Sequence, residues 1–259
     1  MFRYLFLVAV LAQLVIAPAG LAASRSVATR PGVTVDVQVL VPDGATAMVL
    51  LLEGGGGRVR EGSKGFAHLA RQRFERAGIA TALVDAPSDQ RNFMDGMHPR
   101  FRTSADHVAD LDAVVAALRA QSGLPLWLVG VSLGSRSAAH YAVQRADAIA
   151  GVVLLSSSTN PPRGKPVDAF PLHRITTPLL AIAHRDDQCP GTPPTGAQRI
   201  VAAATASPNA RVRIFTGGRN VGGNPCGVAT HHTFSGIEDA VVSAIAEFIA
   251  GNTRYGAGK

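Results

Sequence analysis

The sequence of 259 residues has few charged side chains, few aromatic side chains and only two cysteines. Charged residues make up 17% and aromatic residues 5%, whereas hydrophobic residues reach 47%. This composition excludes a disordered chain and allows a large buried core. No segment repeats with a period of roughly 20 to 50 residues, which excludes a solenoid. Because no long polar linker divides the chain either, we expect a single domain.

The charge balance is basic, with 25 lysines and arginines against 18 acidic residues and a formal net charge of +7. The densest basic stretch spans residues 58–76 and consists mostly of arginine. Such a stretch could face an anionic membrane surface or substrate, but we favour a solvated face. No nucleic-acid-binding motif accompanies it, so no nucleic-acid partner is expected. The number of subunits is left open.

The first 23 residues have the layout of a secretory signal peptide. Arg3 supplies the positive start, residues 5–16 are largely apolar, and small residues follow up to Ala22 and Ala23. The apolar run is too short for a comfortable membrane span, so we expect cleavage after Ala22 or Ala23. The sequence therefore predicts an exported protein, periplasmic or secreted, whose single domain spans residues 24–259. An uncleaved N-terminal anchor is the alternative.

A G-x-S-x-G pentapeptide occupies residues 130–134, with Ser132 at its centre. Residues 124–129 before it are apolar and predict a buried strand, and residues 135–143 after it predict a helix. Strand, tight turn and helix are the context in which this pattern forms a nucleophile elbow. The two flanking glycines remove the Cβ atoms that would clash in such a turn.

Two further segments follow in the order Ser, Asp, His. Residues 178–183 predict another buried strand, which leads to a pair of aspartates ending at Asp187. A pair of histidines ending at His232 then precedes the last predicted helix. With these motifs, the chain from roughly residue 33 to residue 250 resembles the α/β-hydrolase superfamily, in particular its small single-domain serine esterases.

Strands and helices are expected to alternate along the rest of the chain, which predicts a mostly parallel central sheet with helices on both faces. Residues 33–41 predict an edge strand, and a capping box at Ser235 predicts the start of the final helix. Only some twenty Pro- and Gly-rich residues separate the strands at residues 149–155 and 178–183, so we expect an α/β-hydrolase fold with a minimal lid or none. The other expected strands are residues 47–52, 79–84 and 212–215, and the other expected helices are residues 65–77, 104–120 and 195–206.

The resemblance implies a catalytic triad. A serine hydroxyl needs a neighbouring base, and the base needs a carboxylate that orients it. His232 fits the His-x-Phe pattern of the family and is the preferred base for Ser132, with His231 as the alternative. Asp187 lies four residues past its strand, as the family acid does, with Asp186 as the alternative.

The resemblance also implies an oxyanion hole built from backbone N–H groups. One donor is expected at Leu133, and the other in the glycine loop after the strand of residues 47–52, at Gly55 or Gly56. Relatives often have histidine just before these glycines, whereas this chain has Glu53. The loop lacks the Gly-Lys-Ser/Thr ending of a phosphate-binding loop.

The two cysteines flank the expected acid and base. Cys189 follows Asp187 by two residues, and Cys226 precedes His232 by six. In an oxidising compartment such cysteines tend to pair, which would tie the two loops together. Two free thiols are the alternative. A metal site is not expected, because two scattered cysteines lack the usual paired spacing.

The sequence therefore predicts an exported serine hydrolase that cleaves small carboxylic esters through an acyl-serine intermediate, without metal or cofactor. Two alternatives stay open. The first is a non-catalytic binding or scaffold protein on the same fold, because fold does not settle function. The second is an acyltransferase that uses the same acyl-enzyme.

Overall fold

The structure is a computed structural model that describes residues 23–92, 96–162 and 164–253. The predicted signal peptide lies outside the described residues, except for Ala23, which begins the first strand. Within the described ranges, no helix has both the length and the apolar character that crossing a bilayer requires.

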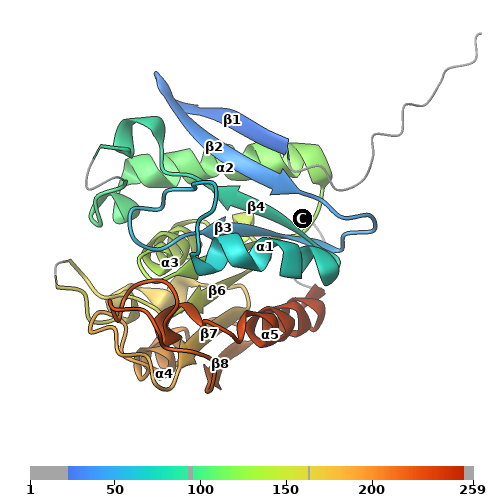
Figure 1. Cartoon of the computed structure of the whole chain (residues 1–259). Coiled ribbons are helices and arrows are strands. Elements are labelled where there is room, and N and C mark those ends of the chain that lie inside the picture. Colours follow the sequence, from blue (N-terminus) through green and yellow to red (C-terminus); the bar gives the residue numbers. More distant parts are fainter. Residues whose placement is uncertain (1–22, 93–95, 163, 254–259) are drawn as a thin grey trace, which may run out of the picture.

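In the part of the chain that the structure describes, eight strands form one sheet in the order β1-β2-β4-β3-β5-β6-β7-β8 (Figure 1). The strands from β3 to β8 pair in parallel, whereas β2 pairs antiparallel with β1 and with β4. Every residue of β3 to β7 is buried, as expected for strands covered on both faces. The strands are Ala23–Arg30, Val33–Leu40, Ala47–Leu52, Ile79–Val84, Leu126–Val131, Gly151–Leu155, Leu179–His184 and Ala210–Phe215.

Helices cover both faces of the sheet. α1 (Phe66–Arg76) and α5 (Glu238–Ala250) lie in front of it in Figure 1, and α2 (Ala105–Ser122) and α3 (Gly134–Gln144) lie behind it. The short α4 (Gly196–Ala203) packs on the same face as α2 and α3. Two hydrophobic cores result, one on each face, and successive residues of β3 point into opposite cores. The predicted sheet, with helices on both of its faces, is therefore confirmed.

The predicted edge strand is not at the edge. Residues 33–41 were expected there, but β1 pairs with β2 from Val33 to Val39 and itself forms the edge. The sequence of β1 has no hydrophobic pattern that would predict a strand, because most of its residues are exposed and polar. The alternation along β2 arises because one of its faces is buried and the other only partly covered.

The predicted start of the last helix is also wrong. α5 begins at Glu238, three residues later than the capping box at Ser235 suggests. The backbone is left-handed at Phe234 (φ 56°) and at Gly236 (φ 83°), so these residues cannot continue a right-handed helix. Instead, the Glu238 carboxylate accepts a hydrogen bond from the N–H of Gly236 at 3.0 Å.

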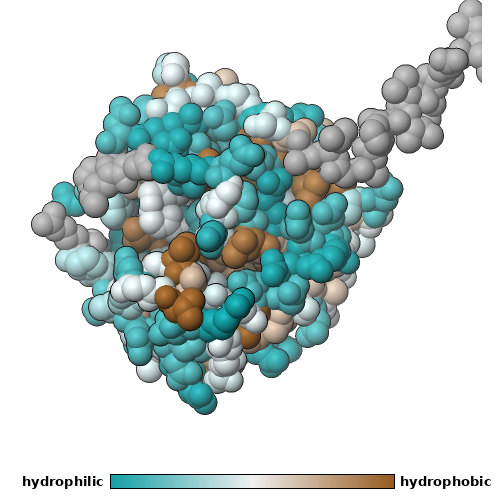
Figure 2. All heavy atoms as spheres, in the orientation of Figure 1, coloured by the Kyte–Doolittle hydropathy of each residue, from teal (hydrophilic) through white to brown (hydrophobic). Residues whose placement is uncertain are grey.

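The loops that follow the parallel strands gather at one end of the sheet, on the left in Figure 1. Figure 2 shows the molecule from the same side as Figure 1. This side is mostly hydrophilic, with hydrophobic side chains grouped near its centre and lower left. Among its described residues, the connection from β6 to β7 contains only two short 3-10 helices, Val167–Ala169 and Leu172–Arg174. Because ligands bind beyond the carboxyl ends of parallel strands, this end is where a site is expected.

Candidate active site

Ser132 stands in the tight turn between β5 and α3. Its φ of 53° is left-handed, which is uncommon for a residue with a side chain. The flanking glycines allow this turn: a Cβ at Gly134 would collide with the carbonyl oxygen of Leu52, and one at Gly130 would lie 2.5 Å from the carbonyl oxygen of Gly134. Ser132 is half-buried. The turn therefore has the strained geometry of a nucleophile elbow.

Asp187 and His232 form a buried pair at the same end of the sheet. Oδ2 of Asp187 lies 3.0 Å from Nδ1 of His232, and the two side chains are 1% and 2% exposed. The other carboxylate oxygen of Asp187 accepts the N–H of Cys189 at 2.9 Å. The structure thus pairs the two residues that the sequence favoured, whereas Asp186 and His231 point elsewhere.

Thr192 contacts both residues of this pair, which the sequence did not suggest. Its hydroxyl lies 3.0 Å from Oδ2 of Asp187 and 3.1 Å from Nδ1 of His232, and the residue is buried. A carboxylate only accepts hydrogen bonds, so the Thr192 O–H donates to Asp187. A threonine in a proline-rich loop carries no sequence signal for such a role.

Two hydrogen bonds place Ser132 and His232 on neighbouring segments. The N–H of Ser132 donates to the carbonyl of Leu155, at the end of β6, at 3.0 Å. Ser156, which follows Leu155, donates its hydroxyl to the carbonyl of His232 at 2.8 Å. Within the described chain, His232 bonds through Nδ1, and no hydrogen bond joins its Nε2 to Oγ of Ser132. Such bonds often tighten only when substrate is bound.

The glycine loop after β3 lies against the nucleophile. A Cβ at Gly54 would be 3.0 Å from the Cβ of Ser132. The N–H of Gly54 is already used, because it donates to Oε1 of Glu53 at 2.9 Å. Among the described residues, the backbone N–H groups of Leu133, Gly55 and Gly56 have no hydrogen-bond acceptor. The sequence predicted two oxyanion donors among these three groups, Leu133 and either Gly55 or Gly56.

Glu53 replaces the histidine that relatives often have, and the structure shows what it does. Its Oε2 accepts the N–H of Ala67 at 3.1 Å, in the first turn of α1. A carboxylate is stabilised at the positive end of a helix. Gly65 makes room for it, because a Cβ there would collide with the carboxylate. Glu53 thus anchors the start of the glycine loop to α1.

The two cysteines are joined, as the sequence predicted. The Cys189–Cys226 disulfide links the loop after β7 to the segment that leads to His232. That segment includes two strongly exposed hydrophobic residues, Val221 (77% exposed) and Val228 (45% exposed). The N–H of Val221 donates to the carbonyl of Ala229 at 3.0 Å, so the segment folds back on itself beside the histidines.

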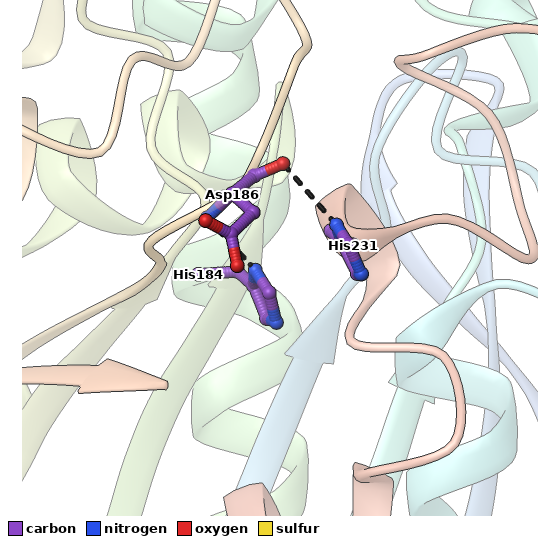
Figure 3. A group of neighbouring side chains, drawn as sticks. All are labelled: His184, Asp186 and His231. Atoms are coloured by element: carbon purple, nitrogen blue, oxygen red, sulfur yellow. Dashed lines mark hydrogen bonds between the residues drawn. The ribbon is translucent and has the colours of Figure 1, made fainter. Parts of the chain in front are cut away.

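A second group of titratable residues lies beside the pair, formed by His184, Asp186 and His231 (Figure 3). Their potential ligand atoms lie within 4.8 Å of one another, but the nitrogens of His184 are both used. Its Nδ1 accepts the N–H of Asp186 at 3.1 Å, and its Nε2 therefore carries the proton and donates to the carbonyl of Gly217 at 2.9 Å.

The same group has further contacts that do not suit a cation. The Asp186 carboxylate is paired with Arg185 at 3.2 Å, and the rings of His184 and His231 stack with centroids 4.2 Å apart. Burial lowers the pKa of His184 and favours its neutral form. Through these contacts the three residues connect the acid loop to the histidine loop.

Comparisons with known proteins agree with this fold. A family model, Hydrolase_4, described as serine aminopeptidase, S33, matches residues 44–184, which is more than half of the chain. No curated protein matches the sequence. Est1E from Butyrivibrio proteoclasticus is similar in structure, with a TM-score of 0.63 and 15% identity over 91% of this chain and 100% of that chain.

Two other solved structures are similar to a comparable degree. A dienelactone hydrolase from Anabaena variabilis has a TM-score of 0.66 and 18% identity, covering 91% of this chain and 99% of its own. XC6422 from Xanthomonas campestris, described as an α/β serine hydrolase without a lid, has a TM-score of 0.60 and 13% identity, covering 94% and 100%. The family match, with this shared fold, shows that the chain belongs to the α/β-hydrolase family described as serine aminopeptidase, S33.

Proposed function

We propose that the protein is an exported serine hydrolase that cleaves small carboxylic esters. One observation carries the proposal: a buried Asp187–His232 pair, 3.0 Å apart, lies at the same end of the sheet as the strained, half-buried Ser132. A serine becomes a useful nucleophile only beside a base, and the base needs an oriented tautomer. The hydrogen bond from Nδ1–H of His232 to Asp187 leaves Nε2 as the acceptor of a proton.

The reaction proceeds in two halves. Oγ of Ser132 attacks the ester carbonyl while its proton passes to Nε2 of His232. The tetrahedral intermediate then collapses, the alcohol leaves with that proton, and an acyl-serine remains. Water attacks the acyl group with His232 again as the base, and the acid product is released as the serine regains its proton. Asp187 stays ionised throughout and stabilises the imidazolium form of His232.

The negative oxygen of the intermediate needs donors that are already in place. Leu133 supplies one N–H at the start of α3, where the helix dipole adds a positive field. Gly55 or Gly56 supplies the other, because the N–H of Gly54 is taken by Glu53. Of these two, Gly55 adjoins Gly54, the glycine that lies against Ser132.

The surroundings favour an ester with an apolar part. The short connection from β6 to β7 leaves the site open, and Val221 and Val228 expose apolar surface on the segment that leads to His232. One structural neighbour, Pf2001 from Pyrococcus furiosus, is named as an esterase, which supports ester cleavage here. The Cys189–Cys226 bridge suits an oxidising compartment and supports export.

A panel of p-nitrophenyl esters with graded acyl length tests the proposal. We expect the native protein to hydrolyse short or medium acyl esters. The Ser132→Ala variant should lose turnover by about 10⁴-fold or more while keeping its fold. Equal turnover by the native protein and the variant would overturn the assignment, and so would a native protein that turns over none of the esters.

A further inference from the structure

Arg102 is a buried cation close to the candidate site. It is 1% exposed and lies in a short 3-10 helix, Phe101–Thr103, just before α2. Within the described chain, no carboxylate lies within ion-pair distance of it. Burial of an arginine without such a partner is costly, so its neighbours must satisfy it in another way.

The two terminal nitrogens of Arg102 donate to the glycine loop and to the helix after the nucleophile, whereas no hydrogen bond from Nε is found among the described residues. Nη2 donates to the carbonyl of Gly55 at 2.8 Å and to that of Glu53 at 3.1 Å. Nη1 donates to Oγ of Ser137, on α3, at 3.1 Å. One planar guanidinium therefore fastens the loop that carries one oxyanion donor to the helix that begins beside the other.

Two further carbonyls of the loop accept backbone hydrogen bonds. Gly57 donates to the carbonyl of Gly54 at 2.9 Å, and Met97 donates to that of Gly56 at 2.8 Å. The described chain has no cis peptide bonds, so each N–H points opposite to the carbonyl of its own peptide unit. When the carbonyl of Gly55 is held by Arg102, the N–H of Gly56 is turned away from Arg102.

The loop needs such an external constraint because glycine imposes little of its own. Gly55 and Gly57 have left-handed φ angles of 51° and 71°, and four glycines follow one another. A chain of this kind has many accessible conformations. We propose that Arg102 is a positioning residue, which holds the glycine loop so that its free N–H groups face the oxyanion of the proposed esterase reaction.

The surroundings of Arg102 leave its guanidinium charged and the nearby His107 neutral. Burial lowers the pKa of Arg102 to about 10, which leaves it protonated near neutral pH. Burial, and then Arg102 itself, lower the pKa of His107 to about 3, so the imidazole stays neutral. Ser137 lies between them, with its Oγ 2.9 Å from Nε2 of His107. Arg102 thus stays positively charged beneath the loop.

Arg136 is a matched control in the same region. It is 2% exposed, lies on α3, and donates to a backbone carbonyl, that of Lys165, at 2.7 Å. Its hydrogen bonds reach the connection between β6 and β7 rather than the glycine loop. Loss of Arg136 should therefore lower the free energy of unfolding, as loss of Arg102 should, without disturbing the oxyanion donors.

The test compares Arg102→Met, Arg102→Lys and Arg136→Met. We measure kcat and KM with p-nitrophenyl butyrate, and the Ki of a short alkyl trifluoromethyl ketone, whose adduct with serine carries an oxyanion. Arg102→Met should lower kcat by about 10²-fold, with KM nearly unchanged and Ki raised in parallel. Arg102→Lys keeps the charge but loses the planar, forked guanidinium, so its kcat and Ki should lie between those of Arg102→Met and those of the native protein. Arg136→Met should keep kcat and Ki near native.

The outcomes separate this inference from the proposed function on which it rests. A native protein without ester turnover or inhibition by the ketone would refute the esterase. A native esterase in which Arg102→Met and Arg136→Met behave alike would overturn the role of Arg102. If Arg102→Met does not fold, the inference depends on Arg102→Lys, and native kcat and Ki in that variant would overturn it.

Discussion

The two halves of the site are held in different ways. The half with Ser132 and the glycine loop follows two central strands, β5 and β3, and its position depends on close packing of glycines and on buried Arg102. The half with Asp187 and His232 lies on loops after β7 and β8, toward the sheet edge. It depends on a disulfide and on hydrogen bonds between loops.

This difference follows from where each half lies. Central strands are covered by helices on both faces, so the nucleophile turn is supported by a large core. The segment from residue 216 to residue 229 is mostly exposed and contains five glycines, so it has little apolar contact of its own. Loops without a core need covalent or polar constraints to present a side chain accurately.

The largest effect should come from the residues that meet across the second half. His232→Asn and Asp187→Asn should each lower kcat for p-nitrophenyl butyrate by about 10⁴-fold, because the base or its orienting carboxylate is lost. His231→Asn and Asp186→Asn are matched controls, one residue away in each case, and should lower turnover far less, because they weaken contacts between the loops but keep the base and its carboxylate. Losses of equal size in both sets would show that the pair has been assigned to the wrong residues.

A smaller effect should follow from removal of the covalent link in the second half. The bridge spans a sequence separation of 37 residues. A Cys189→Ser/Cys226→Ser variant should lose about 4 kcal/mol in free energy of unfolding, because its unfolded chain is less restricted. Denaturant titration of the variant and of native protein, each with and without reductant, provides the measurement.

The reductant provides the control for these titrations. The native protein with reductant should match the variant, and the variant should be insensitive to reductant. An unchanged unfolding midpoint in the variant would contradict the proposed stabilisation.

The smallest effect concerns pH and compares buried histidines of the two halves. Burial lowers the pKa of His107 to about 3, whereas an unfolded histidine titrates near about 6.5. The unfolded state therefore binds more protons than the folded state below about pH 6.5, and the free energy of unfolding should fall as pH drops toward about 3. Burial lowers the pKa of His184 in the same direction.

Urea titrations between about pH 4 and pH 7 measure this slope, which is at most about 1.4 kcal/mol per pH unit for each such group. His107→Gln in the first half and His184→Gln in the second should each flatten it, because glutamine does not titrate. A slope that stays the same in His107→Gln would contradict a neutral buried histidine there.

Much of the fold could be predicted from the sequence because its signals are local. Strands β3 to β7 are apolar apart from Thr81 and His184, and the elbow at Ser132 is marked by its glycines and by the strand and helix around it. The spacing from strand to acid also favoured Asp187 over Asp186, and the structure pairs Asp187 with His232. The catalytic roles of these residues stay predictions.

The features that the sequence could not reveal depend on contacts between distant segments. Arg102 is one arginine among many, and only the fold brings it to the glycine loop, 47 residues away from Gly55. Thr192 likewise has no marker, and β1 lacks a hydrophobic pattern because it is exposed. The departure at Glu53 was visible in the sequence, but its contact with the start of α1 was not.

The most direct measurement of the central claim is the position of a covalent label. Native protein is treated with a fluorophosphonate, digested, and examined by peptide mass spectrometry, with His232→Asn treated in parallel. The account predicts one phosphonylated residue, Ser132, and much slower labelling in the variant. A label on another serine, or equal labelling rates in both proteins, would contradict the proposal that Ser132, His232 and Asp187 act as one unit.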